Sequence, residues 1–140
     1  MPIIRLSERN NQVWILMKQL TYVYNEQFAW NQSYFALASK ELKLDFVGGW
    51  QIDQRYGGWD PLLKGEMKDF EDRKNGVVNL GRLNPIEFMQ QVGRSKVMIG
   101  VGSPWWSPSP YNALCQGVPF INPVSVTHVQ PFTALSFLRN

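Results

Sequence analysis

The segment MIGVGSPWWSPSPYN, residues 98–112, combines residue types that suit the binding of a phosphorylated ligand. An apolar strand is followed by Gly100 and Gly102, and then by a loop that leads into a predicted helix start at 107–110. In a parallel sheet, such a loop lies at the carboxyl end of a strand, where ligands bind. The free backbone N–H groups at the start of a helix favour phosphate, so this loop is a candidate anion site.

The side chains of the loop add to this chemistry. Ser107 and Ser109 place hydroxyl groups beside the backbone amides. Three prolines in the same segment fix the backbone φ angle and lower the entropy lost when the loop is ordered. Trp105 and Trp106 either line a ligand site or pack against a neighbouring helix. We therefore predict a preformed loop over residues 102–109.

Other kinds of site find less support in the sequence. The Gly-Val-Gly at 100–102 matches only part of a dinucleotide-binding fingerprint, because its third glycine position is not matched. His128 is the only histidine and Cys115 the only cysteine. An internal disulfide is therefore excluded, and no Cys/His cluster with metal-ligand spacing is present. With one histidine and one cysteine in the sequence, a Ser–His or Cys–His catalytic pair finds little support.

Alternating strands and helices are predicted to position this loop. Short apolar runs predict strands at 13–17, 44–47, 77–80, 96–100 and 118–121. Apolar spacing and start signals predict helices at about 27–42, 61–74, 84–93 and 107–116. Asn84 and Pro85 are a cap and a first-turn proline, and Gly93 and Gly117 are predicted helix stops. Strands alternating with helices indicate an α/β fold with a Rossmann-like parallel sheet.

Length and charge narrow the function classes. The 140 residues fit one domain, and we expect an N-terminal extension over 1–12 and the domain over 13–140. The net charge of +3 is spread over scattered basic residues, without the basic stripe that nucleic-acid binding requires. No apolar run approaches the roughly 20 residues of a membrane span, and no signal peptide is evident. We therefore expect the chain as given to be soluble, with no nucleic-acid partner.

Residues 79–123 resemble the C-terminal, donor-binding half of glycosyltransferase family 18, the alpha-1,6-mannosylglycoprotein 6-beta-N-acetylglucosaminyltransferases. The shared pattern is Gly-x-Gly after a strand, a Pro-aromatic turn, a Pro-x-Pro helix start, a helix with a small residue, a glycine, and Phe-aliphatic-Asn-Pro. The corresponding residues here are Gly100 and Gly102, Pro104-Trp105, Pro108-Ser109-Pro110, Ala113, Gly117, and Phe120-Ile121-Asn122-Pro123. An apolar strand ending in lysine, residues 13–18, extends the similarity.

The resemblance implies one half of a two-domain GT-B glycosyltransferase that inverts configuration and uses UDP-GlcNAc as donor substrate, with no metal and no other cofactor. The missing N-terminal half would bind the N-glycan acceptor and supply the carboxylate base, so no catalytic residue is assigned to this chain. The chain would then be a fragment of a longer enzyme on the lumenal side of the Golgi membrane. The sequence agrees on one point, because it has no Asp-x-Asp pair to hold a cation on the diphosphate.

The resemblance also implies roles for individual residues. Lys18 and the loop amides would neutralise the diphosphate. Gly81 and Leu83 would lie beside the nucleotide base, and the two tryptophans would line the sugar site. The full set of implied donor-binding residues is Lys18, Gly81, Leu83, Gly102, Ser103, Pro104, Trp105, Trp106, Ser107, Ser109 and Asn112. Asn112 stands where the family has a glutamate that binds the ribose hydroxyls. An amide accepts a hydrogen bond there without the added strength of a charge.

Three functions stay open at this point. The first is the UDP-GlcNAc-binding half of an N-acetylglucosaminyltransferase acting on N-glycan mannose. The second is a non-catalytic nucleotide- or glycan-binding module of the same fold, which Asn112 and the missing acceptor half favour. The third is an unrelated α/β interaction domain whose aromatic loop docks a protein partner.

Overall fold

The computed structural model describes residues 2–19, 32–51, 76–101 and 107–122. They contain a five-stranded sheet of order β3-β2-β1-β4-β5 in which every neighbouring pair is parallel. The strands are β1 (Gln12–Leu16), β2 (Asp45–Gly48), β3 (Val77–Asn79), β4 (Val97–Gly100) and β5 (Phe120–Ile121). The predicted α/β, Rossmann-like parallel sheet is therefore confirmed.

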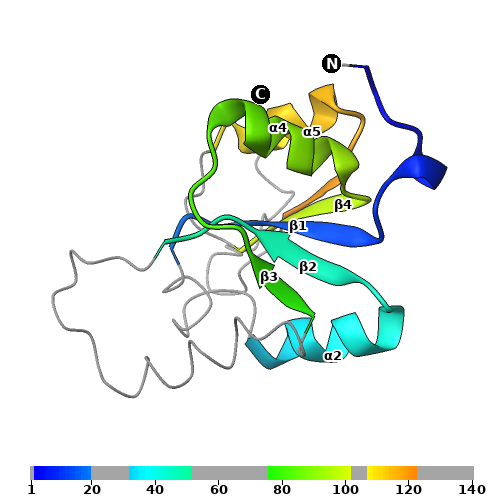
Figure 1. Cartoon of the computed structure of the whole chain (residues 1–140), viewed down its shortest axis with the longest axis vertical. Coiled ribbons are helices and arrows are strands. Elements are labelled where there is room, and N and C mark those ends of the chain that lie inside the picture. Colours follow the sequence, from blue (N-terminus) through cyan, green and yellow to red (C-terminus); the bar gives the residue numbers. More distant parts are fainter. Residues whose placement is uncertain (1, 20–31, 52–75, 102–106, 123–140) are drawn as a thin grey trace, which may run out of the picture.

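Helices cover both faces of this sheet (Figure 1). The described helices are η1 (Leu6–Glu8), α2 (Gln32–Leu42), α4 (Pro85–Arg94) and α5 (Ser109–Cys115). Helix α2 lies on one face, whereas α4 and α5 lie together on the other. The chain runs from β1 outward to β3 and then returns past β1 to β4. Because crossovers of one hand change face when they change direction, this reversal places α2 and α4 on opposite faces.

Two of the predicted helices extend beyond what the structure describes. The predicted helix at 27–42 is present as α2 over its described part, and residues 27–31 lie outside the described ranges. The predicted helix at 61–74 lies outside them entirely. Within the described ranges, no helix has the length and apolar character needed to cross a membrane.

The core has one apolar cluster on each face of the sheet. Neighbouring residues of β1 divide between them, because successive side chains of a strand point to opposite faces. Ile15 enters the cluster beneath α2, where Phe35 meets Phe46 edge-to-face with ring centroids 5.3 Å apart. Trp14 enters the cluster beneath α4 and α5, whose other fully buried members are Val92, Met98, Ala113 and Val118. Burial on both faces explains why these strands are continuous apolar runs.

Helix α4 begins as the sequence predicts. The Asn84 side-chain Oδ1 accepts hydrogen bonds from the backbone N–H groups of Ile86 (2.9 Å) and Glu87 (3.0 Å). In return, the Glu87 carboxylate accepts from the backbone N–H of Asn84 at 2.9 Å. Pro85 fills the first helical position, whose N–H would have no partner in any case. This reciprocal capping fixes the start of α4 at the carboxyl end of the sheet.

The prediction that Gly93 ends this helix is wrong. Helix α4 continues through Gly93 to Arg94, and Ser95 caps it. Gly93 is buried, and a Cβ atom there would lie 2.9 Å from the side-chain Oε1 of Gln116. The glycine therefore permits a close approach between α4 and the residue that follows α5. Gly117, by contrast, has φ +65° just beyond the end of α5 and acts as the predicted stop.

Arg9, just before β1, ties the N-terminal segment to the ends of two helices. Its side chain is only 8% exposed. The Nε and Nη2 atoms donate to the carbonyl oxygen of Ile4 at 3.0 and 2.9 Å. Nη2 also donates to the carbonyls of Gln116 (3.2 Å) and Gly117 (3.0 Å), and Nη1 donates to that of Ser95 (3.4 Å). These acceptors lie beside the amino ends of β4 and β5.

Candidate functional site

A cavity of about 480 Å³ opens at the carboxyl end of the sheet. Its lining comes from the ends of β1, β2 and β3 and from the first turns of α4 and α5. It lies where the chain reverses direction across the sheet, the place at which open parallel sheets bind ligands. Its volume falls within the roughly 300–1,000 Å³ of small-molecule sites.

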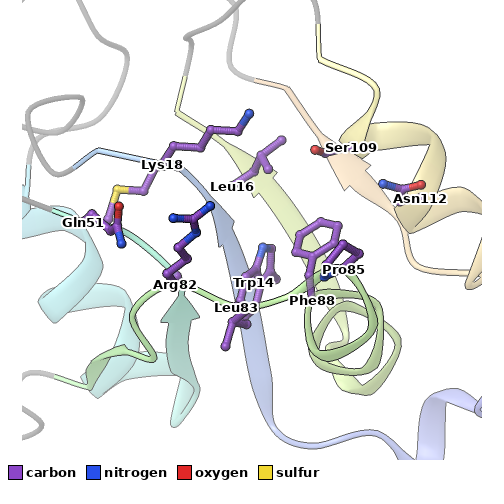
Figure 2. Close-up of a pocket in the computed structure, with 12 residues that line it drawn as sticks. Trp14, Leu16, Lys18, Gln51, Arg82, Leu83, Pro85, Phe88, Ser109 and Asn112 are labelled. Carbon is purple, nitrogen blue, oxygen red and sulfur yellow. The ribbon is translucent and has the colours of Figure 1, made fainter. Parts of the chain in front are cut away.

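One wall of the cavity is apolar and partly aromatic. Trp14 on β1 is 2% exposed and meets Phe88 on α4 edge-to-face, with ring centroids 5.8 Å apart and an interplanar angle of 73°. Figure 2 shows these two rings with Leu83 and Pro85 beside them. Edge-to-face packing holds the Phe88 ring in place by favourable quadrupole contact. The wall therefore offers a fixed apolar surface to a ligand ring.

The charged side chains at the cavity are Lys18, which follows β1, and Arg82, which follows β3. Both are exposed, and neither side chain pairs with a carboxylate or another acceptor among the described residues. No Asp or Glu is among the described lining residues. Because the described lining carries positive charge only, its field attracts anions. Figure 2 shows both cationic groups on the same side of the cavity.

The loops after β1 and β2 run side by side at this end. The backbone N–H of Gln51 donates to the carbonyl oxygen of Lys18 at 3.1 Å. Gln51 also forms an isolated parallel bridge with Gln19. Gln51 is exposed and also lines the cavity. This backbone hydrogen bond therefore fixes the Cα positions of Lys18 and Gln51 relative to each other.

The wall opposite the cationic groups comes from the first turn of α5. Ser109 and Asn112 line the cavity there, and both are half-buried. Ser107 is engaged within the helix start, because its Oγ accepts from the backbone N–H of Ser109 (3.3 Å) and donates to the Ser109 Oγ (3.1 Å). Ala113, next to Asn112, is fully buried and anchors α5 on the sheet. The packing of α5 on the sheet therefore sets the positions of the Ser109 hydroxyl and the Asn112 amide.

The structure brings together four of the predicted donor-binding residues and adds others. Lys18, Leu83, Ser109 and Asn112 line one cavity, whereas Gly81 and Ser107 are not among its lining residues. Gly81 has φ +70° and turns the chain after β3. The remaining predicted residues lie outside the described ranges: Gly102, Ser103, Pro104, Trp105 and Trp106.

Sequence reasoning missed Arg82, Gln51 and the aromatic pair Trp14–Phe88. The signal for Arg82 was present, because it lies between two residues already singled out at the end of a predicted strand. A cation at the carboxyl end of a parallel strand is a candidate anion contact in the same way as Lys18. The aromatic pair carried no separate signal, since both residues also satisfy core patterning.

The comparisons with known proteins add no family to this geometry. No protein-family model matches the chain, and no curated protein matches it. Among the described residues, no group of three or more His, Cys, Asp and Glu side chains is placed to hold a metal ion. The functional inference therefore rests on the cavity and on the resemblance in residues 79–123.

Proposed function

We propose that the protein binds a nucleotide sugar, UDP-GlcNAc, in the cavity at the carboxyl end of the sheet. In this proposal the chain is the donor half of an inverting, metal-independent N-acetylglucosaminyltransferase that acts on N-glycan mannose in the Golgi. One observation carries the proposal: Lys18 and Arg82 bring two positive charges, unpaired within the described residues, to a cavity that also has an apolar, partly aromatic wall. A nucleoside diphosphate combines the two matching properties, an anionic diphosphate and a flat base.

Lys18 and Arg82 suit the diphosphate. An ammonium group binds phosphate as a point charge, and a guanidinium group can bind two phosphate oxygens at once. Hydrogen bonds of this charged kind contribute about 1.5–3 kcal/mol each, and less where water competes. The hydroxyl of Ser109 lies on the facing wall and can donate to a phosphate oxygen from that side.

The apolar wall and the amide groups suit the nucleoside. Leu83 and Phe88 give an apolar surface against which a pyrimidine ring can pack. The amides of Gln51 and Asn112 each carry donors and an acceptor, so they can bind the edge of a base or a ribose hydroxyl. Because Asn112 carries no charge, its bond to a ribose hydroxyl is weaker than that of a glutamate.

The same cations would assist the transfer step. When the acceptor hydroxyl oxygen forms its bond to the sugar C1 atom, the bond between C1 and the diphosphate oxygen breaks. The bonding electrons stay on the leaving UDP, whose negative charge increases. Lys18 and Arg82 would stabilise that charge electrostatically, which is the service a metal ion performs in other enzymes. The proton of the acceptor hydroxyl would go to a carboxylate base on the acceptor half.

Asn112 also supports a second candidate, a binding module without turnover. The described lining contains no carboxylate that could bind the ribose diol. A chain that keeps the fold and a weakened nucleotide site can serve as a sensor or docking module for nucleotides or glycans. This candidate shares the ligand of the first and differs in having no transfer step.

Calorimetric titration with UDP and UDP-GlcNAc tests the proposal. We expect saturable binding, weakened about 10-fold by Lys18→Ala because one charged contact is lost. Lys40→Ala is the matched control, since Lys40 is exposed on α2, on the opposite face of the sheet, and should leave the affinity unchanged. Absence of binding at millimolar UDP would overturn both candidates.

A transfer assay separates the two candidates. A longer chain that includes the upstream half would be incubated with UDP-GlcNAc and a biantennary N-glycan, and the product would be followed by mass spectrometry. Addition of one N-acetylhexosamine supports the transferase. Saturable UDP binding with no transfer supports the module.

A further inference from the structure

Asn79, the last residue of β3, joins the two loops that leave β2 and β3. Its side-chain Oδ1 accepts hydrogen bonds from the backbone N–H of Trp50 at 3.2 Å and from that of Gly81 at 2.9 Å. Trp50 is 1% exposed, so its backbone is held firmly by the core. One oxygen atom therefore links the turn after β3 to a buried part of the neighbouring loop.

The backbones of these two loops are also in close contact. A Cβ atom on Gly49 would lie 2.7 Å from the carbonyl oxygen of Gly81. The backbone N–H of Leu80 donates to the carbonyl oxygen of Gly48 at 2.8 Å. The backbone N–H of Gln51 also donates to the carbonyl oxygen of Lys18. Backbone hydrogen bonds therefore link the segments that follow β1, β2 and β3.

The side-chain position of Gly81 in this turn lies open. Gly81 adopts φ +70°, and apart from its two chain neighbours no residue has an atom within 4 Å of the position where its Cβ would be. Packing therefore does not hold this turn from its side-chain side. The next residue along the chain is Arg82, whose guanidinium group faces the cavity in Figure 2. A glycine has more accessible backbone conformations than other residues, so the hydrogen bonds at this turn help to select one.

We propose that Asn79 is a positioning residue for the anion site: by fixing the turn at Gly81 it sets where Arg82 meets the ligand. The inference rests on the proposed function, because it assigns Asn79 to the same nucleotide site. Asn79 acts through Arg82 and does not touch the ligand. The arrangement holds the Arg82 backbone in its binding position before the ligand arrives, so less entropy is lost on binding.

A double-mutant cycle on UDP affinity tests this role. The proteins compared are the wild type, Asn79→Ala, Arg82→Ala and the double variant, all measured by calorimetry. We expect Arg82→Ala to weaken binding about 10-fold and Asn79→Ala about 5-fold. The double variant should bind only about 10-fold more weakly than wild type, because Asn79 has no effect once Arg82 is gone. A loss near the product, about 50-fold, would overturn the positioning role.

A second cycle provides the control. Ser109 lies on α5 at the opposite wall, and the hydrogen bonds described for its side chain and backbone N–H are to Ser107. Asn79→Ala and Ser109→Ala should therefore multiply in their effects. A general loosening of the site would instead make both cycles behave alike. If Asn79→Ala does not fold, Asn79→Ser is used, because a serine hydroxyl makes the same turn bond more weakly.

The outcomes separate the inference from the function on which it rests. No UDP binding by the wild type overturns the proposed nucleotide site and this inference with it. Wild-type binding combined with multiplicative effects of Asn79→Ala and Arg82→Ala overturns only the positioning role.

Discussion

Two arginines lie at opposite ends of the same sheet and have opposite surroundings. Arg9, at the amino end, is 8% exposed and donates to the carbonyl oxygens of Ile4, Ser95, Gln116 and Gly117. Arg82, at the carboxyl end, is exposed and has no side-chain partner among the described residues. The guanidinium group of Arg9 is engaged in hydrogen bonds within the fold, whereas that of Arg82 is available to a ligand.

The direction of the helices explains this difference. In a strand–helix–strand unit the helix returns antiparallel to the strands, so helix carboxyl ends gather at the amino end of the sheet. Helix carboxyl ends present carbonyl oxygens without partners, with negative partial charge. Arg9 satisfies those that follow α4 and α5. The carboxyl end of the sheet instead receives helix amino ends, which present N–H groups. A cation there, such as Lys18 or Arg82, finds no such acceptors, and an anionic ligand can supply them.

The largest effect should come from Arg9→Ala. It would remove the donor to the buried carbonyl groups of Ser95 and Gln116 and to two less buried ones, so we expect the free energy of unfolding to fall by about 2–4 kcal/mol. Urea denaturation measures this, and the UDP affinity of the folded protein should stay unchanged. Arg94→Ala is the control, because Arg94 is exposed at the end of α4 and should change stability by less than about 0.5 kcal/mol. An Arg9→Ala variant as stable as the wild type would contradict the assigned role.

Arg82→Ala should show the reverse pattern. We expect UDP affinity to fall about 10-fold, equivalent to about 1.4 kcal/mol, because one charged contact to the diphosphate is lost. The free energy of unfolding should change by less than about 0.5 kcal/mol, since the side chain is exposed. Calorimetry and urea denaturation on the same preparation check both values. A loss of stability similar to that of Arg9→Ala would remove the contrast between the two ends.

Two glycines with positive φ give the finest test. Gly81 near the cavity and Gly117 near Arg9 have φ +70° and +65°, which an alanine adopts only with strain. Each Gly→Ala change should lower the free energy of unfolding by about 1–2 kcal/mol. Only Gly81→Ala should also weaken UDP binding, because it alone shifts the turn that carries Arg82. Equal affinities for the two variants would show that the cavity does not depend on that turn.

The sequence predicted the sheet well because parallel strands buried on both faces are continuous apolar runs. The run at 96–100 and the Asn84–Pro85 start of α4 both lie where the sequence predicts them. Gly93 was misjudged, because its buried contact with Gln116 arises only when α4 and α5 pack side by side. A glycine kept for close packing has the same sequence signature as a glycine that ends a helix.

The candidate site was predicted in part for a similar reason. Lys18 and Asn112 were singled out through the resemblance in residues 13–18 and 79–123, and the topology brings them to one cavity. Arg82 was missed although it lies between Gly81 and Leu83 at a predicted strand end, because that position alone does not show that its side chain faces a cavity. The sequence also does not show that Arg9 is buried and hydrogen-bonded, because its acceptor Gln116 lies 107 positions further along the chain.

The central position of the first strand has a consequence for how the protein is made. Val13 of β1 pairs with Phe46 of β2 on one edge and with Val97 of β4 on the other. During synthesis from the N-terminus, the second edge of β1 therefore has no partner until residue 97 has emerged. The guanidinium group of Arg9 cannot form its hydrogen bonds to Gln116 and Gly117 until those later residues have been synthesised. An open strand edge exposes unpaired N–H and C=O groups to other chains. Nascent chains that stall before β4 should therefore aggregate or recruit chaperones more readily than those that stall after β5.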